Sequence, residues 1–178
     1  MDDLVGRVNA ARAYHDLWAA IEGHGIRKNH RDELIAHEVL AETIMDASKK
    51  AFWVTICSLY DAHPRSVSIQ RFNEYLKSSG KPDPSWDARF TEIQELAVRL
   101  NKVRNKYFCH VSEETFERDF LAEVKLIYDD FPRIIERTWE LVEGLHSRYG
   151  LGELEYEQDP LPDLRKLFPN FDQEKAWS

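Results

Sequence analysis

Hydrophobic positions recur every three or four residues through most of the chain, which is the period of an amphipathic helix. Leu4, Val8, Ala11 and Trp18 follow this spacing in a helix predicted over residues 2–22. No stretch alternates hydrophobic and polar residues with the period of two that a half-buried strand requires. The pattern therefore predicts an all-α fold.

The longest apolar stripe belongs to a second helix, expected from about Asn29 to Ala62. Its members are Leu40, Ile44, Ala47, Ala51, Val54 and Ser58. Their spacing of fours and threes is typical of a helix that packs lengthwise on others, so we expect this stripe to face the core. Pro64 cannot continue the helix and disfavours a helical residue before it.

Further helices are expected in the second half of the chain. Their predicted ranges are 68–80, 86–109, 112–128 and 132–150. Ser68 and Ser112 are suited to cap helix N-termini, and Gly80 and Gly150 to end helices. Residues 81–87 contain two prolines and are expected to form a loop. Trp18, Trp53, Trp86 and Trp139 fall mostly at apolar positions, which predicts that they belong to the core.

Composition and charge predict how the helical pattern is organised into a domain and a tail. The chain of 178 residues contains 7 Gly and 7 Pro, few enough to favour long helices over a turn-rich β fold. We predict an antiparallel helical bundle over residues 1–150. Acidic residues outnumber basic ones in residues 151–178, which are expected to form an acidic C-terminal tail with one short helix at most.

The sequence shows no feature of a membrane or secreted protein. No apolar run approaches the roughly 18 residues of a membrane span, and the N-terminus lacks the apolar core of a signal peptide. Cys57 and Cys109 have no spacing typical of a disulfide framework or a zinc knuckle. We expect a cytoplasmic protein with no membrane partner and no cofactor.

Positive charge is concentrated in one segment of an otherwise acidic chain. The net charge is −8, which excludes a generally basic nucleic-acid coat. Residues 99–110, RLNKVRNKYFCH, nevertheless contain no acidic residue. On a helix Arg99, Lys102, Lys106 and His110 share one face, and such a basic stripe is suited to RNA phosphates.

Arg104 points away from that stripe, to the edge of the apolar face that carries Ala97 and Leu100. An arginine on an apolar face needs a partner, because an unpaired buried charge is costly. If this face forms a two-fold interface, Arg104 and His110 of two chains converge in one cleft.

The residue types in this segment suit RNA cleavage without a metal. The reaction removes a proton from a ribose 2′-hydroxyl, protonates the leaving 5′-oxygen and places extra negative charge on the phosphate. A histidine side chain ordinarily titrates near neutral pH, so a residue of this type at position 110 can move protons. Arg104 offers a planar set of donors to phosphate oxygens. Asn105 can orient the phosphate or His110 by hydrogen bonding.

The same residues resemble a known family. Arg104 and Asn105, followed by Lys-Tyr-Phe-Cys and His110, are similar to the Arg-x(4–6)-His motif of HEPN domains, in which Asn, Asp or His commonly follows the arginine. The preceding segment AFWVTICSLYDAHPRSVSIQRFNEYL resembles the AbiU-type, abortive-infection branch of that family. The resemblance covers about Ala36–Tyr149.

The resemblance implies an all-α bundle that forms a homodimer with a composite active site. It also implies a metal-independent endoribonuclease that leaves 2′,3′-cyclic phosphate and 5′-hydroxyl ends. Arg104, Asn105 and His110 would be catalytic, and Arg99, Lys102 and Lys106 would bind RNA. The setting would be phage defence or a toxin–antitoxin pair, with an antitoxin protein as partner.

Three other interpretations stay open at this point. The segment can be a solvated basic helix end that interacts favourably with the helix dipole. The chain can be a non-catalytic HEPN-type module that binds a protein or a nucleotide. His30, Glu33 and His37 have the spacing of metal ligands in a bundle, but a further ligand is missing and we assign no metal site.

Overall fold

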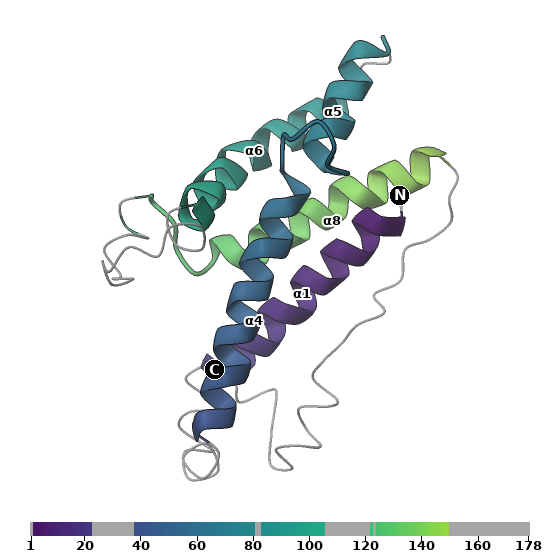
Figure 1. Cartoon of the computed structure of the whole chain (residues 1–178). Helices are drawn as coiled ribbons and strands as arrows, with labels where there is room; N and C mark the ends of the chain where they lie inside the picture. Colours follow the sequence, from purple (N-terminus) through teal and green to yellow (C-terminus); the bar gives the residue numbers. More distant parts are fainter. Residues whose placement is uncertain (1, 23–37, 81–82, 106–121, 123, 150–178) are drawn as a thin grey trace.

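The computed structural model describes residues 2–22, 38–80, 83–105, 122 and 124–149 (Figure 1). The helices in this part are α1 (Asp2–Glu22), α4 (Glu38–Leu59), α5 (Ile69–Ser78), α6 (Pro84–Arg104) and α8 (Asp130–Tyr149). No strand occurs among the described residues, which confirms the all-α prediction. The expected helical turns before Glu38 and the acidic tail lie outside the described residues.

The four long helices pack on one another as a bundle. α4 runs back along α1, and α8 contacts both α1 and α6 (Figure 1). α6 also contacts α4 near the ends of both helices. None of the helices described is both long and apolar enough to cross a bilayer.

Aromatic side chains from three helices form the centre of the core. Trp18 of α1 lies 6.0 Å from Phe52 of α4 and 5.4 Å from Phe131 of α8, between ring centroids. Trp53 lies 5.3 Å from Phe131, edge to face. Large aromatic surfaces dominate burial energetics, so this cluster joins α1, α4 and α8. The tryptophan prediction is confirmed: Trp18, Trp53 and Trp86 are buried and Trp139 is half-buried.

A buried hydrogen-bond chain links the end of α4 to α8. The hydroxyl of Thr138 donates to the carbonyl of Ile134, 2.5 Å away. The hydroxyls of Tyr60 and Thr138 are also 2.5 Å apart, so Tyr60 is the donor of that bond. Burial raises the pKa of Tyr60 above its ordinary value. These two hydrogen bonds give partners to polar groups whose burial would otherwise be costly.

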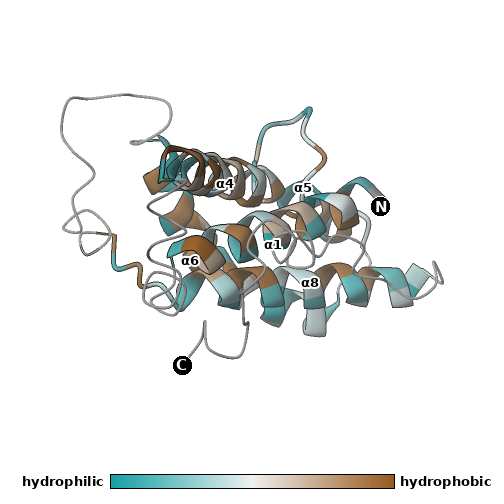
Figure 2. Cartoon of the chain, turned by 90° about the horizontal axis from the view of Figure 1, so that it is seen from below, coloured by the Kyte–Doolittle hydropathy of each residue, from teal (hydrophilic) through white to brown (hydrophobic). Residues whose placement is uncertain are grey.

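α4 buries a different face from the one predicted. Its buried residues are Ala41, Ser48, Phe52, Trp53, Ile56, Cys57 and Leu59. Leu40 and Val54 of the predicted stripe are 51% and 54% exposed, and Ala47 is exposed as well. The helix carries apolar residues on two faces, and burying the bulky aromatic face removes more area from water. In Figure 2, the visible side of α4 carries more hydrophobic residues (brown) than the visible side of α8.

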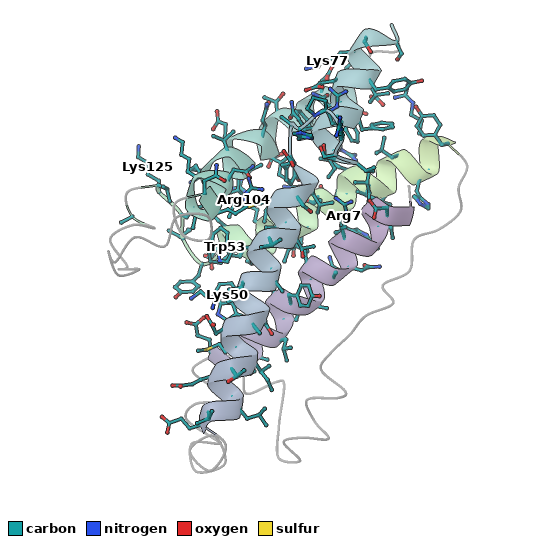
Figure 3. All side chains as sticks on the ribbon, viewed as in Figure 1. Arg7, Lys50, Trp53, Lys77, Arg104 and Lys125 are labelled. Carbon is teal, nitrogen blue, oxygen red and sulfur yellow. The ribbon has the colours of Figure 1, made fainter. Side chains whose placement is uncertain are left out.

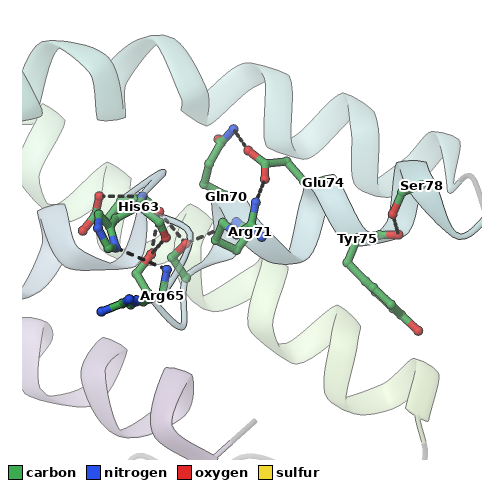
Figure 4. A network of polar contacts seen from close by, with 10 residues as sticks. His63, Arg65, Gln70, Arg71, Glu74, Tyr75 and Ser78 are labelled. Carbon is green, nitrogen blue, oxygen red and sulfur yellow. Dashed lines mark hydrogen bonds and ion pairs between the residues drawn. The ribbon is translucent and has the colours of Figure 1, made fainter.

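The short helix α5 begins and ends as the sequence predicts. The Ser68 hydroxyl accepts a hydrogen bond from the Arg71 amide at 3.2 Å and donates to the Asp61 carbonyl at 2.6 Å. Gly80 follows the helix with a φ of +66°, a conformation that favours glycine. Figure 4 shows the surrounding network, in which His63 Nδ1 accepts from the Arg65 amide at 3.2 Å.

α6 begins earlier than the sequence predicts. The Asp83 carboxylate accepts hydrogen bonds from the amides of Ser85 and Trp86, at 3.0 and 3.2 Å. Pro84 then occupies the first turn, where its missing N–H costs nothing. The predicted loop is therefore wrong for residues 84–87, because the proline starts the helix rather than interrupting it.

The segment before α8 also differs from the prediction. A helix was expected to continue through Tyr128, but residues 124–129 form turns and irregular backbone. Lys125 has a φ of 56°, which a continuing helix excludes. The carbonyl of Lys125 accepts a hydrogen bond from Arg99, and Asp130 accepts from the Ile127 amide at 3.1 Å. Contacts with α6 and α8 therefore fix the turn.

Candidate functional site

The candidate residues that the structure describes lie at the C-terminal end of α6. We use "the basic end of α6" for Arg99, Lys102, Arg104 and Asn105. The helix is held against the core by the buried residues Leu96, Leu100 and Val103. This packing fixes the direction of the polar side chains that lie between them, since a helix places neighbours at defined angles.

Arg104 and Asn105 form a side-chain pair. The Nε and Nη2 groups of Arg104 donate to Asn105 Oδ1 at 3.2 and 3.0 Å. The Asn105 amide oxygen therefore orients the guanidinium without neutralising it. Within the described residues Arg104 forms no ion pair, and the guanidinium keeps donors for an anion such as a phosphate.

Arg104 also lies against the last turns of α4. The side chain is half-buried, on the side of α6 that faces α4 (Figure 3). Burial raises the pKa of the Cys57 thiol to about 12, although the charge of Arg104 acts to lower it. The thiol is therefore neutral at physiological pH.

Arg99 is engaged in the fold. Its Nη1 donates to the Lys125 carbonyl and lies 3.7 Å from the Asp130 carboxylate. Asp130 is 6% exposed, so this contact ties α6 to the start of α8. Lys102 is exposed to solvent, whereas Lys106 lies outside the described residues.

The catalytic set predicted from the sequence is placed only in part. The structure brings Arg104 and Asn105 together, and His110 lies outside the described residues. As predicted, Arg104 lies at the edge of the apolar face of α6. The geometry of the guanidinium relative to the imidazole therefore stays a prediction.

The interface suggested for the apolar face of α6 is contradicted. Ala97 and Leu100 are 3% and 1% exposed, because the other helices of the same chain cover them. A second chain cannot pack on a face that is already filled. If two copies bring Arg104 residues together, they use another surface.

The described residues provide no ligand set for the metal site considered as an alternative. No group of three or more His, Cys, Asp or Glu side chains capable of holding a metal occurs among them. His30, Glu33 and His37 lie outside the described part of the chain. That alternative remains a prediction from spacing.

Sequence reasoning missed the neighbours of the basic end of α6. Cys57 approaches Arg104 from α4, and Lys125 and Asp130 approach Arg99 from the turn before α8. Each pair joins residues at least 26 positions apart. No local pattern marks such contacts, because tertiary packing alone creates them.

Comparison of the chain with protein-family models, with curated proteins and with solved structures found no match. The resemblance to HEPN domains therefore rests on the motif at residues 104–110 and on the upstream segment at residues 51–76. The described residues show a guanidinium that Asn105 orients and that forms no ion pair among them, at a basic helix end.

Proposed function

We propose that this chain is a metal-independent endoribonuclease of the HEPN type that acts as a homodimer. The observation that supports the proposal is the Arg104–Asn105 pair, in which an amide oxygen orients the guanidinium and leaves donors for a phosphate. Lys102 adds a solvent-exposed positive charge two residues before Arg104. A local basic site of this kind suits an RNA backbone even in a chain of net charge −8.

The proposed reaction divides its work among three residues. His110 of one chain accepts the proton of the ribose 2′-hydroxyl while the 2′-oxygen bonds to phosphorus. His110 of the second chain protonates the 5′-oxygen as the bond between that oxygen and phosphorus breaks. Arg104 stabilises the charge that develops on the phosphate oxygens. Asn105 holds the guanidinium in place. The products are a 2′,3′-cyclic phosphate and a 5′-hydroxyl.

Cleavage of a labelled single-stranded RNA by the full chain tests the proposal. We expect His110→Ala and Arg104→Ala each to slow cleavage by about a hundredfold or more, the usual cost of losing a proton-transfer group or an oxyanion donor. EDTA should leave the rate unchanged. Mass spectrometry should find 2′,3′-cyclic phosphate ends.

Matched controls separate lost chemistry from lost charge. His63→Ala removes an exposed histidine and Lys77→Ala removes an exposed cation from α5 (Figure 3), and both should cleave at the rate of the unsubstituted protein. Circular dichroism establishes that each variant is folded. Unchanged cleavage by Arg104→Ala would refute the proposal, and loss of cleavage in EDTA would favour the metal site at His30, Glu33 and His37.

One observation favours a second candidate, a non-catalytic module that binds RNA or a protein. Arg99 is committed to Asp130 and to the Lys125 carbonyl, so part of the predicted RNA-binding stripe has a structural role. Cations in the last turn of α6 also interact favourably with the helix dipole. Tight RNA binding without any cleavage would decide for this candidate. In either case we place the protein in cytoplasmic phage defence or a toxin–antitoxin pair.

A further inference from the structure

The turn before α8 carries a cation and an aromatic ring at the surface, beside the basic end of α6. We call residues 124–129 the α8 turn. Leu126 is 3% exposed and anchors the turn in the core. Ile127 and Tyr128 are 62% and 59% exposed, and Lys125 is exposed as well. Figure 3 shows Lys125 next to the C-terminal end of α6.

Hydrogen bonds hold the backbone of the α8 turn against α6. Arg99 donates to the Lys125 carbonyl and lies 3.7 Å from the Asp130 carboxylate. The same carboxylate accepts from the Ile127 amide at 3.1 Å. The Lys125 amide donates to the Ala122 carbonyl at 3.0 Å. These bonds use the backbone of Lys125, and its ammonium group takes no part in them.

Lys125 has a backbone conformation that a lysine seldom adopts. Its φ of 56° lies in the left-handed region, where a Cβ atom crowds the following carbonyl and glycine is favoured. Non-glycine residues in this region gather at binding and active sites, where the side chain has a role that outweighs the strain. A glycine would build this turn with less strain, so the turn itself does not explain a lysine at this position.

The charges around Lys125 suit an anion. Lys102 and Lys125 are both exposed, and neither forms an ion pair among the described residues. Lys102 lies one helical turn after Arg99, which binds the Lys125 carbonyl, so both cations lie on the side of α6 that faces the α8 turn. The buried carboxylate of Asp130 is already bound to Arg99. The two lysines are therefore suited to phosphate oxygens.

Tyr128 adds an aromatic ring to the same turn. Its ring centroid lies 6.0 Å from that of Phe131 and 6.4 Å from that of Trp18. These two buried rings hold Tyr128 in place while most of the residue stays exposed. An aromatic ring fixed at the surface can stack on an unpaired base of any identity. The exposed acid Asp129 follows it and repels phosphate, so this position suits a base rather than a phosphate.

We infer that the α8 turn is a substrate-binding element of the proposed nuclease, in which Lys125 binds a phosphate of single-stranded RNA and Tyr128 stacks on a base. The inference rests on the proposed function for its ligand and adds a subsite outside residues 99–110. Single strands expose base faces that a duplex hides, so the subsite selects unpaired RNA. Lys102 lies between this subsite and Arg104, which is proposed to hold the reacting phosphate.

Variants of Lys125 in the full chain separate RNA binding from a structural role. The probe is a fluorescent 2′-O-methyl RNA strand, which keeps phosphates and bases but lacks the attacking hydroxyl, and anisotropy measures its dissociation constant. Lys125→Ala and Lys125→Gly should both raise this constant about threefold or more at low salt and reduce its salt slope by about 0.7, whereas Lys125→Arg should bind normally. Melting temperatures should follow a different order, with Lys125→Gly about 2 °C above Lys125→Ala, because glycine fits the left-handed φ.

Variants of Tyr128 test the stacking. Tyr128→Leu keeps an apolar side chain against Trp18 and Phe131 but has no aromatic face, so it should raise the dissociation constant about fivefold or more. Tyr128→Phe should bind like the unsubstituted chain. Tyr75 on α5 is the matched control, because it has the same exposed fraction of 59%. Tyr75→Leu and Lys77→Ala should leave the dissociation constant unchanged.

The outcomes separate the subsite from the chemistry. Normal binding by Lys125→Gly or Tyr128→Leu, or equal losses in the two α5 controls, would overturn the inference. Binding that follows these expectations in a chain that cleaves no unmodified RNA supports the subsite and contradicts the proposed nuclease. Cleavage that requires Arg104 and His110, with unchanged RNA binding in the variants of the α8 turn, does the reverse.

Discussion

At the scale of single residues, the buried thiol of Cys57 shows how tertiary contacts set chemistry. The side chain is 1% exposed and its pKa is raised to about 12, chiefly by burial. A thiol in that state is a small packed hydrophobic group rather than a nucleophile. Arg104 lies close enough to lower the pKa but not to overcome burial. Among the described residues at this end of α6, the thiol is therefore a packing group, and the guanidinium of Arg104 is the group that can bind an anion.

The raised pKa of Cys57 predicts a loss of stability at high pH. The folded state holds the thiol proton up to about pH 12, whereas the unfolded chain releases it from about pH 8.5. Between these values the unfolded state binds fewer protons, so the free energy of unfolding falls as the pH rises. Below about pH 8.5 the thiol contributes no pH dependence.

Urea unfolding between about pH 8 and pH 11 measures this slope. In Cys57→Ala the free energy of unfolding should fall less steeply, by up to about 1.4 kcal/mol per pH unit, because one linked proton is gone. Tyr60, whose pKa burial also raises, contributes alike to both proteins. Equal slopes would show that the thiol is not held protonated by the fold.

At the scale of secondary-structure elements, the ends of helices depend on single polar residues. Asp83 caps α6 through the amides of Ser85 and Trp86, and also pairs with Arg148 at the end of α8. The Ser85 hydroxyl and the Trp86 amide hold the pKa of Asp83 below its ordinary value, with a smaller effect from Arg148. One carboxylate thus fixes the start of α6 and its junction with α8.

Asp83→Ala should lower the free energy of unfolding by about 1 kcal/mol at neutral pH, the usual cost of losing a helix cap. Asp83→Asn should lose less, because its amide oxygen still accepts from the helix amides. Since the folded-state pKa is lowered, the contribution of Asp83 is present above about pH 4 and is lost as the pH falls through the folded-state pKa.

Urea unfolding at neutral and acidic pH compares these variants with Glu95→Ala, which removes an exposed acid from the middle of α6. The three variants should converge toward the unsubstituted protein in acid. If Asp83→Ala is as stable as Glu95→Ala at neutral pH, the cap contributes nothing and α6 is held by packing alone.

At the scale of the whole molecule, charge is distributed unevenly along the chain. The net charge is −8, yet residues 99–105 at the end of α6 contain only basic and uncharged residues. Residues 151–178 carry an excess of acidic residues, so their charge is opposite in sign to that of this basic end. We expect the acidic tail to compete with RNA for it, as opposite charges attract over roughly 10 Å at moderate ionic strength.

Neutralising acids of the tail should therefore strengthen RNA binding. The variant Glu153→Gln, Glu155→Gln, Glu157→Gln should bind a labelled single-stranded RNA several-fold more tightly at low salt, with the gain disappearing at high salt. The same substitutions at Glu95, Glu136 and Glu143, exposed elsewhere, change net charge equally and control for it. Equal affinities of the two triple variants would rule out competition by the tail.

The amino-acid sequence by itself determined the helices that the structure describes and several of their ends. The bounds of α1 were predicted as found, and Ser68 and Gly80 delimit α5 as expected. These features are local, because spacing, capping and glycine conformation act within a few residues. Arg104 was likewise placed at the edge of an apolar face by its helical angle alone.

Only the tertiary structure decided which apolar face of α4 is buried, because both faces have helical spacing and the choice depends on what α1 and α8 offer. It also decided that α6 buries Ala97 and Leu100 within one chain, and that Arg99 binds Asp130. These outcomes join residues far apart in sequence. The faces of a helix compete for burial, and the face with the largest apolar surface is favoured because it removes most area from water. The pattern along one helix does not show which face wins, since the outcome depends on the helices that pack against it.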